Sequence, residues 1–65
     1  MKTFSSMSTP HKRLTLQAYE QLGAILELRI LLAKGMPLSI IENLKIQSRR
    51  LEQLMDALKE ELLSE

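Results

Sequence analysis

Apolar residues recur every three or four positions through the C-terminal part of the chain, which predicts an amphipathic helix over about residues 40–63. The opposite face is charged, with residues spaced for pairing between one helical turn and the next. Ser48 interrupts the apolar stripe, and we interpret it as a small residue that lets another helix approach closely. The stripe comprises Ile41, Leu44, Ser48, Leu51, Met55, Leu58 and Leu62.

A longer apolar pattern precedes it and predicts a first helix over about residues 10–34. Thr9 is a typical N-cap, and Pro10 suits the first helical position, where its missing N–H costs nothing. Gly23 is the one poor helix former in the interior of this segment, at a cost of about 1 kcal/mol relative to alanine. No proline interrupts the rest of the segment, so one continuous helix is expected.

The apolar arc of this first helix is too wide for a single partner helix. One edge carries Leu14, Ala18, Leu22, Ile25, Leu28 and Leu32, and the other carries Leu16, Tyr19, Leu26, Ile30 and Ala33. An antiparallel partner helix covers only one such stripe, so the other stripe is expected to remain exposed in a monomer. Exposed apolar patches of this kind usually mark an interface with another molecule.

The segment between the two helices predicts a tight reversal of the chain. Gly35 suits the left-handed position that ends a helix, and Pro37 cannot continue that helix. Ser39 and Glu42 have the spacing of a capping box, which predicts the start of the second helix. A connection this short makes the two helices antiparallel neighbours.

The expected fold is therefore all-α, an antiparallel two-helix hairpin. We expect residues 1–8 to form a short disordered, flexible N-terminal arm, since they are polar and show no hydrophobic period. Residues 9–65 form the hairpin, with the turn at 35–39. The chain has 65 residues, enough for one small domain, whose core is too small to give much stability without a partner.

Composition argues against catalysis, metal binding and cofactor binding. The chain has no cysteine and one histidine, and it lacks a glycine-rich phosphate loop, so we expect no enzyme activity and no cofactor. Nucleic-acid binding is also not expected, because the basic residues form only the pairs Lys12-Arg13 and Arg49-Arg50. No signal peptide or membrane span is evident, so a soluble, cytoplasmic protein is expected.

Two short segments resemble a known family. Leu32-Ala33-Lys34-Gly35 ends the first helix, and Ser48-Arg49-Arg50-Leu51-Glu52 lies on the second. Over about residues 22–58 the chain resembles the small E-type co-chaperones of bacterial type III secretion systems, the YscE/PscE group. The resemblance implies a cytoplasmic hairpin that binds a larger chaperone of tetratricopeptide-like helices. Together the two proteins keep the needle-forming subunit soluble before export.

We assign the two stripes of the first helix to different tasks. Leu22, Ile25 and Leu32 are predicted to hold the hairpin together with Leu44, Leu51, Met55 and Leu58. The predicted partner-binding residues are Leu16, Tyr19, Leu26, Arg29, Ile30 and Ala33. Arg29 is either an arginine whose stem packs while its charge reaches water, or an interface residue that pairs with a carboxylate.

Two other functions remain open. The chain could form a homodimer, a four-helix bundle with a structural or regulatory role. Ser48-Arg49-Arg50-Leu51-Glu52 also distantly resembles the Ser-Gln-x-Leu-Asp signature of small phosphatases that act on sporulation response regulators. Arginine replaces the glutamine and glutamate replaces the aspartate, so a role as a hairpin regulator of a phosphorelay has weaker support.

Overall fold

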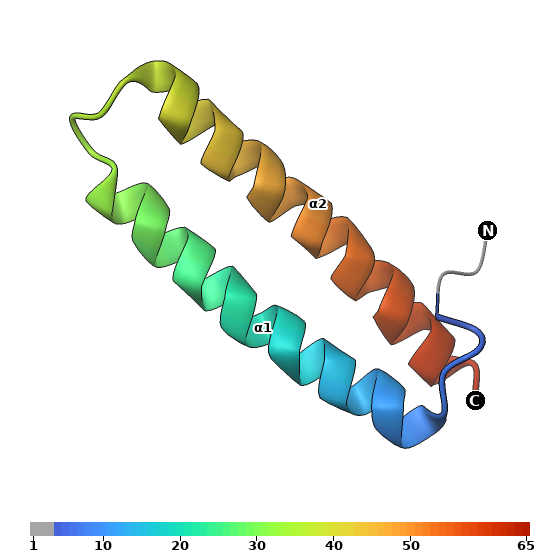
Figure 1. The fold of residues 1–65 in the computed structure, drawn as a ribbon. Coiled ribbons are helices and arrows are strands. Elements are labelled where there is room, and N and C mark those ends of the chain that lie inside the picture. The colour runs from blue at the N-terminus through green and yellow to red at the C-terminus, as the bar shows by residue number, and fades with distance from the viewer. Residues whose placement is uncertain (1–3) are drawn as a thin grey trace.

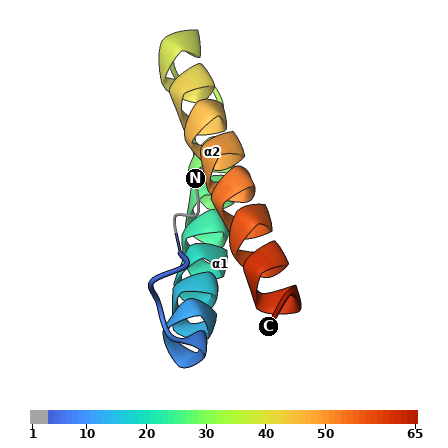
Figure 2. The ribbon, with the colours of Figure 1, turned by 90° about the vertical axis from the view of Figure 1, so that its right-hand side faces the viewer.

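A computed structural model of the chain describes residues 4–65, which form an antiparallel hairpin of two long helices. Helix α1 spans Thr9–Leu32 and helix α2 spans Leu38–Leu63. The helices lie side by side along their whole length, with the turn at one end (Figures 1 and 2). The molecule measures 44 × 21 × 15 Å. The predicted all-α hairpin is confirmed.

The two helices meet along a seam to which each contributes residues spaced alternately by three and four positions. Every residue of this seam is buried or half-buried, whereas most other helical residues are exposed. Such spacing is typical of antiparallel coiled coils. From α1 the seam takes Lys12, Leu16, Tyr19, Gly23, Leu26, Ile30 and Ala33, and from α2 it takes Ile41, Leu44, Ser48, Leu51, Met55, Leu58 and Leu62.

The core within this seam is small. Leu58 is fully buried, and Leu26, Ala33 and Leu51 are nearly so. The stripe predicted on the second helix is therefore confirmed as the face that packs within the hairpin. Most residues of both helices are exposed, including the large hydrophobic residues on the far side of α1.

The N-terminal arm differs from its prediction. Residues 1–3 lie outside the described part of the chain, and residues 4–8 lie against the hairpin, where a flexible arm was expected. Phe4 is only 2% exposed, and its ring lies edge-on to Tyr19 with 6.3 Å between the centroids. The Met7 N–H donates to Phe4 O at 3.0 Å and closes a turn. Burial of the phenyl ring offsets part of the conformational entropy lost when this segment is ordered.

Helix α1 begins one residue earlier than expected. Ser8, not Thr9, is the N-cap, and its Oγ accepts a hydrogen bond from the His11 N–H at 3.3 Å. The Ser8 carbonyl accepts from the Lys12 N–H at 2.9 Å. Pro10 lies in the first turn, where it removes no hydrogen bond.

The turn between the helices contains the one positive φ found in residues 4–65, at Gly35 with φ 92°. Helix α1 ends at Leu32 with Ala33 as its C-cap, and the Met36 N–H donates to Ala33 O at 2.8 Å. The predicted left-handed glycine is confirmed, although the helix ends two residues before the predicted position. Glycine enters this region without the steric penalty that other residues meet.

Helix α2 begins without the predicted capping box. Its N-cap is Pro37, which makes no side-chain hydrogen bond, so Ser39 already lies inside the helix. The Pro37 carbonyl accepts from the Ile40 N–H at 3.1 Å and from the Ile41 N–H at 3.4 Å. The fixed φ of proline suits an extended residue at this boundary, and the helix therefore starts two residues earlier than predicted.

An ion pair closes the open end of the hairpin. Lys12 is only 5% exposed, and its Nζ lies 2.6 Å from Oε1 of Glu65, while Thr9 Oγ1 donates to Oε2 of the same carboxylate. These bonds from Lys12 and Thr9 lower the pKa of Glu65 below its ordinary value. The first turn of α1 and the residue that follows α2 are thereby held together.

Candidate protein-interaction surface

The face of α1 opposite the seam carries a second apolar stripe, which we call the outer stripe. It has the same spacing of three and four residues as the seam, and no side chain of the described chain covers it. Leu14 is 64% exposed and Leu32 is 73% exposed. The outer stripe consists of Leu14, Ala18, Gln21, Leu22, Ile25, Leu28 and Leu32.

The apolar surface continues past the end of α1 onto the turn. Leu31 in the last turn of α1, Met36 in the connection, and Leu38 and Ile40 in the first turn of α2 are all large hydrophobic residues with exposed side chains. An exposed leucine by itself is ordinary in a folded protein. Five large hydrophobic side chains exposed along one face of a helix are less usual, and they make this face a candidate interaction surface.

The prediction of which α1 residues pack against α2 was wrong. Leu22, Ile25 and Leu32 were predicted to hold the hairpin together, but all three are exposed on the outer stripe. The residues that pack within the hairpin belong to the other edge of the arc. The edge of the arc that contains Leu22, Ile25 and Leu32 is thus the exposed one.

The six residues predicted to bind a partner lie mostly inside the hairpin. Leu26 and Ala33 are buried, Leu16, Tyr19 and Ile30 are half-buried, and all five belong to the seam with α2. Arg29 is exposed at the border of the outer stripe. Partner binding by these residues stays a prediction, but in this hairpin only Arg29 among them presents a largely open side chain.

One signal in the sequence points to the correct stripe. One set of residues on α1 alternates steps of four and three, the same alternation as the apolar stripe of α2. This set runs from Lys12 through Leu16, Tyr19 and Gly23 to Ala33. The set contains a lysine and a glycine, so it is less apolar than the outer stripe and is harder to identify as the buried face. The structure explains both exceptions, because Lys12 pairs with Glu65 and Gly23 lies against Leu51.

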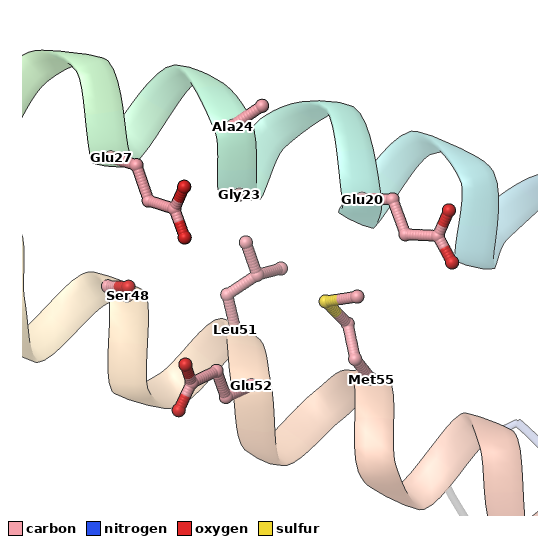
Figure 3. A pocket seen from close by; sticks show the side chains of 8 residues that line it. All are labelled: Glu20, Gly23, Ala24, Glu27, Ser48, Leu51, Glu52 and Met55. Carbon is pink, nitrogen blue, oxygen red and sulfur yellow. The ribbon is translucent and has the colours of Figure 1, made fainter.

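A shallow hollow of about 280 Å³ opens on one side of the seam beside Gly23 (Figure 3). Leu51 and Met55 point into it from α2, and the missing side chain of the glycine leaves the space above Leu51 open. The rest of its lining is Glu20, Ala24, Glu27, Ser48 and Glu52.

The lining of this hollow is acidic and contains one hydroxyl group. Among residues 4–65, Ser48 is the one hydroxyl-bearing residue that lines it, Glu20, Glu27 and Glu52 supply carboxylates, and no histidine, lysine or arginine takes part. Within residues 4–65 no three histidine, cysteine or acidic side chains are grouped in a way that could hold a metal ion. We interpret the hollow as a packing defect, because Gly23 has no side chain to fill the space above Leu51.

The outer face of α2 is charged, in contrast to that of α1. Arg49 and Arg50 are exposed there, among acidic residues of the same helix such as Glu52 and Asp56. Lys12 is buried in its ion pair with Glu65, so the Lys12-Arg13 pair does not form an exposed basic patch. The apolar outer stripe of α1 is thus the surface that distinguishes this molecule.

Neither helix is long and apolar enough to span a bilayer, as judged over residues 4–65. Comparisons of the chain with protein-family models, with curated proteins and with solved structures found no match. Two features of the chain bear on its function: the exposed outer stripe and the two short segments, Leu32-Ala33-Lys34-Gly35 and Ser48-Arg49-Arg50-Leu51-Glu52.

Proposed function

We propose that the chain is a non-enzymatic, protein-binding co-chaperone of the cytoplasm. It pairs with a larger chaperone of tetratricopeptide-like helices and helps to keep a type III secretion needle subunit soluble before export. The observation that carries this proposal is the outer stripe, which remains uncovered although α2 already fills the seam. A hairpin of this design is completed by another chain.

The outer stripe offers enough apolar area for specific binding. Its large residues, Leu14, Leu22, Ile25, Leu28 and Leu32, are each about half exposed or more. If each loses on the order of 100 Å² on binding, the gross gain is on the order of 10 kcal/mol at 25 cal/mol per Å². That gain exceeds the lower estimates of the entropic cost of association, which start at about 4 kcal/mol.

The shape of the surface suits a concave helical partner. The outer stripe is one straight helical face with anchors three and four residues apart, the arrangement that a groove between helices accepts. Arrays of helical repeats present such concave grooves. Arg29 borders the stripe and would pair with a carboxylate at the rim of that groove.

Co-expression tests the proposal. The chain is produced together with the tetratricopeptide-like chaperone and the needle subunit of a type III secretion system from the same source. The expected result is a soluble complex that contains all three proteins and survives size-exclusion chromatography. Leu28→Glu, in the middle of the outer stripe, is expected to remove this chain from the complex, because it places a charge in an apolar contact.

Ile46→Glu is the matched control. Ile46 is exposed on α2, outside the outer stripe, so the same substitution there is expected to leave the complex intact. Circular dichroism of both variants establishes that the helices persist. A needle subunit that stays equally soluble without this chain, or a complex that Leu28→Glu does not affect, would contradict the proposal.

A further inference from the structure

We propose that in the isolated protein the outer stripe is covered by the outer stripe of a second copy. The two α1 helices lie antiparallel across a two-fold axis, with both α2 helices on the outside. This inference concerns the chain by itself and does not depend on the proposed hetero-complex. It follows from the register of the stripe, from its charges and from its area.

The register of the outer stripe is symmetric about position 23, so the stripe is complementary to itself in the antiparallel direction. Leu14 of one copy lies opposite Leu32 of the second, and Ala18 lies opposite Leu28. Each contact occurs twice, as a two-fold interface requires. The small Ala18 faces a large leucine, which allows the helices to interdigitate.

The centre of this register is also compatible with close packing. Gln21 of one copy lies opposite Ile25 of the second, beside the axis. Leu22 then lies next to Leu22 of the second copy on one flank of the axis, and Ala24 lies next to Ala24 on the other. Gln21 is the single polar residue of the stripe and is exposed in the single hairpin, so the register places one amide from each copy near the centre of the interface.

The charges of α1 do not oppose this pairing. Arg29 is the one charged residue that borders the outer stripe, and the register places it level with Gln17 of the second copy, away from the other Arg29. Glu20 and Glu27 line the hollow beside the seam, on another side of α1. The antiparallel direction also sets the two helix dipoles in opposition, which is the favourable arrangement.

The area agrees with a modest but specific dimer. The five large residues of the outer stripe are each about half exposed or more. Two copies together would bury on the order of 1,000 Å², near the lower limit for a biological protein interface. Leu31 is 72% exposed at the rim of this surface, and the register places it level with Thr15 of the second copy.

This dimer has a regulatory consequence if the proposed function also holds. The same stripe cannot contact a second copy and a larger chaperone at once, so the partner would have to displace the second copy. Self-association then protects the apolar face until the partner is present. This last step rests on the proposed function, whereas the dimer itself does not.

Sedimentation equilibrium of the purified chain is the first test. The wild-type protein is expected to show twice the monomer mass at high concentration and to dissociate on dilution. Leu28→Glu is expected to weaken the dimer about 100-fold or more, because its charge is buried once in each copy. Ile46→Glu, on the outer face of α2, is expected to leave the dimer unchanged.

Cysteine cross-linking tests the register independently of mass, and the chain contains no cysteine of its own. Ala18→Cys and Leu28→Cys are expected to form a mixed disulfide dimer when the two variants are combined under oxidising conditions. Each variant alone is expected to link poorly, because equal positions lie about 15 Å apart in the antiparallel register. A disulfide needs Cα atoms within about 7 Å.

The outcomes separate the alternatives. A wild-type chain that stays monomeric at roughly millimolar concentration overturns the dimer. Efficient linking of Ala18→Cys with itself overturns the antiparallel register in favour of a parallel one. Loss of the dimer in Ile46→Glu but not in Leu28→Glu would place the interface on α2. None of these results bears on whether the secretion complex forms, which the co-expression experiment decides separately.

Discussion

Gly23 of α1 faces Leu51 of α2 across the seam with room for one more methyl group. A Cβ atom at Gly23 would lie 3.6 Å from Cδ2 of Leu51, an ordinary van der Waals distance. Gly23→Ala is therefore expected to raise the free energy of unfolding by about 0.5–1 kcal/mol, because alanine is the better helix former. Urea denaturation followed by circular dichroism measures the change.

Gly23→Leu is the informative companion variant. Its larger side chain has to displace Leu51 and is expected to destabilise the hairpin by about 1–3 kcal/mol. If alanine also destabilises, the helices approach more closely than the structure shows, and the glycine is required for packing.

Leu58 is the most completely buried side chain among residues 4–65. Its side chain is 0% exposed, so Leu58→Ala is expected to lower the free energy of unfolding by about 2–5 kcal/mol through lost burial and an unfilled cavity. Leu63→Ala is the matched control on the same helix, since Leu63 is 86% exposed. Its effect is expected to stay within about 0.5 kcal/mol. Equal effects in the two variants would be inconsistent with the observed seam.

Phe4 fastens the N-terminal arm to the hairpin. Phe4→Ala is expected to lower the free energy of unfolding by up to about 3 kcal/mol, since a buried phenyl ring and its edge contact with Tyr19 are lost. Phe4→Leu, which keeps most of the bulk, is expected to lose less. Hydrogen exchange provides a local check, because release of the arm should speed exchange at the Met7 amide, whose acceptor is Phe4 O.

Acid is expected to loosen the open end of the hairpin. The bonds from Lys12 and Thr9 lower the pKa of Glu65 from 4.5, so the folded state favours the ionised carboxylate. The resulting stabilisation is fully present above pH 4.5 and is lost as the pH falls below that value towards the lowered pKa. Glu65→Gln is expected to reduce this part of the acid dependence, as measured by urea unfolding at a series of pH values.

Glu60→Gln provides the comparison for the acid experiment, because Glu60 is an exposed acid near the same end of α2. It removes the same charge without removing the bonds to Lys12 and Thr9. An acid profile that changes equally in both variants would show that net charge, and not this ion pair, governs the pH dependence.

Gly35 is expected to tolerate no ordinary side chain without cost. Its φ of 92° is unfavourable for L-residues, so Gly35→Ala should lower the free energy of unfolding by about 1–2 kcal/mol. No atom lies within 4 Å of an added Cβ, so the loss would come from the backbone alone. Gly35→Asn is expected to lose less, because asparagine enters this region more readily. An alanine variant as stable as the wild type would indicate a different turn.

Much of the fold could be predicted because it depends on local signals. The spacing of apolar residues in α2 identified its buried face, and Gly35 with Pro37 identified the reversal of the chain. The ends of the helices were less predictable. Ser8 and Thr9 are equally good caps in the sequence, and the choice between them depends on how the arm folds back onto Tyr19.

The buried side of α1 could not be predicted from apolar character alone. Both stripes have suitable spacing, and the stripe with the lysine and the glycine is the one that packs against α2. Lys12 is acceptable there only because Glu65, distant in sequence, reaches it. Such a long-range pair is invisible to a pattern read along one helix, and it decided which residues remained available for a partner.

The ion pair between Lys12 and Glu65 also determines where probes can be attached. It joins the first turn of α1 to Glu65 at the end of the hairpin far from the turn (Figure 1). A fluorophore linked after Glu65 would stand well away from Met36 and Leu38 of the same copy. In the proposed antiparallel dimer it would lie near the turn of the second copy, so labelling at that end should report on self-association through a change in the fluorophore's surroundings.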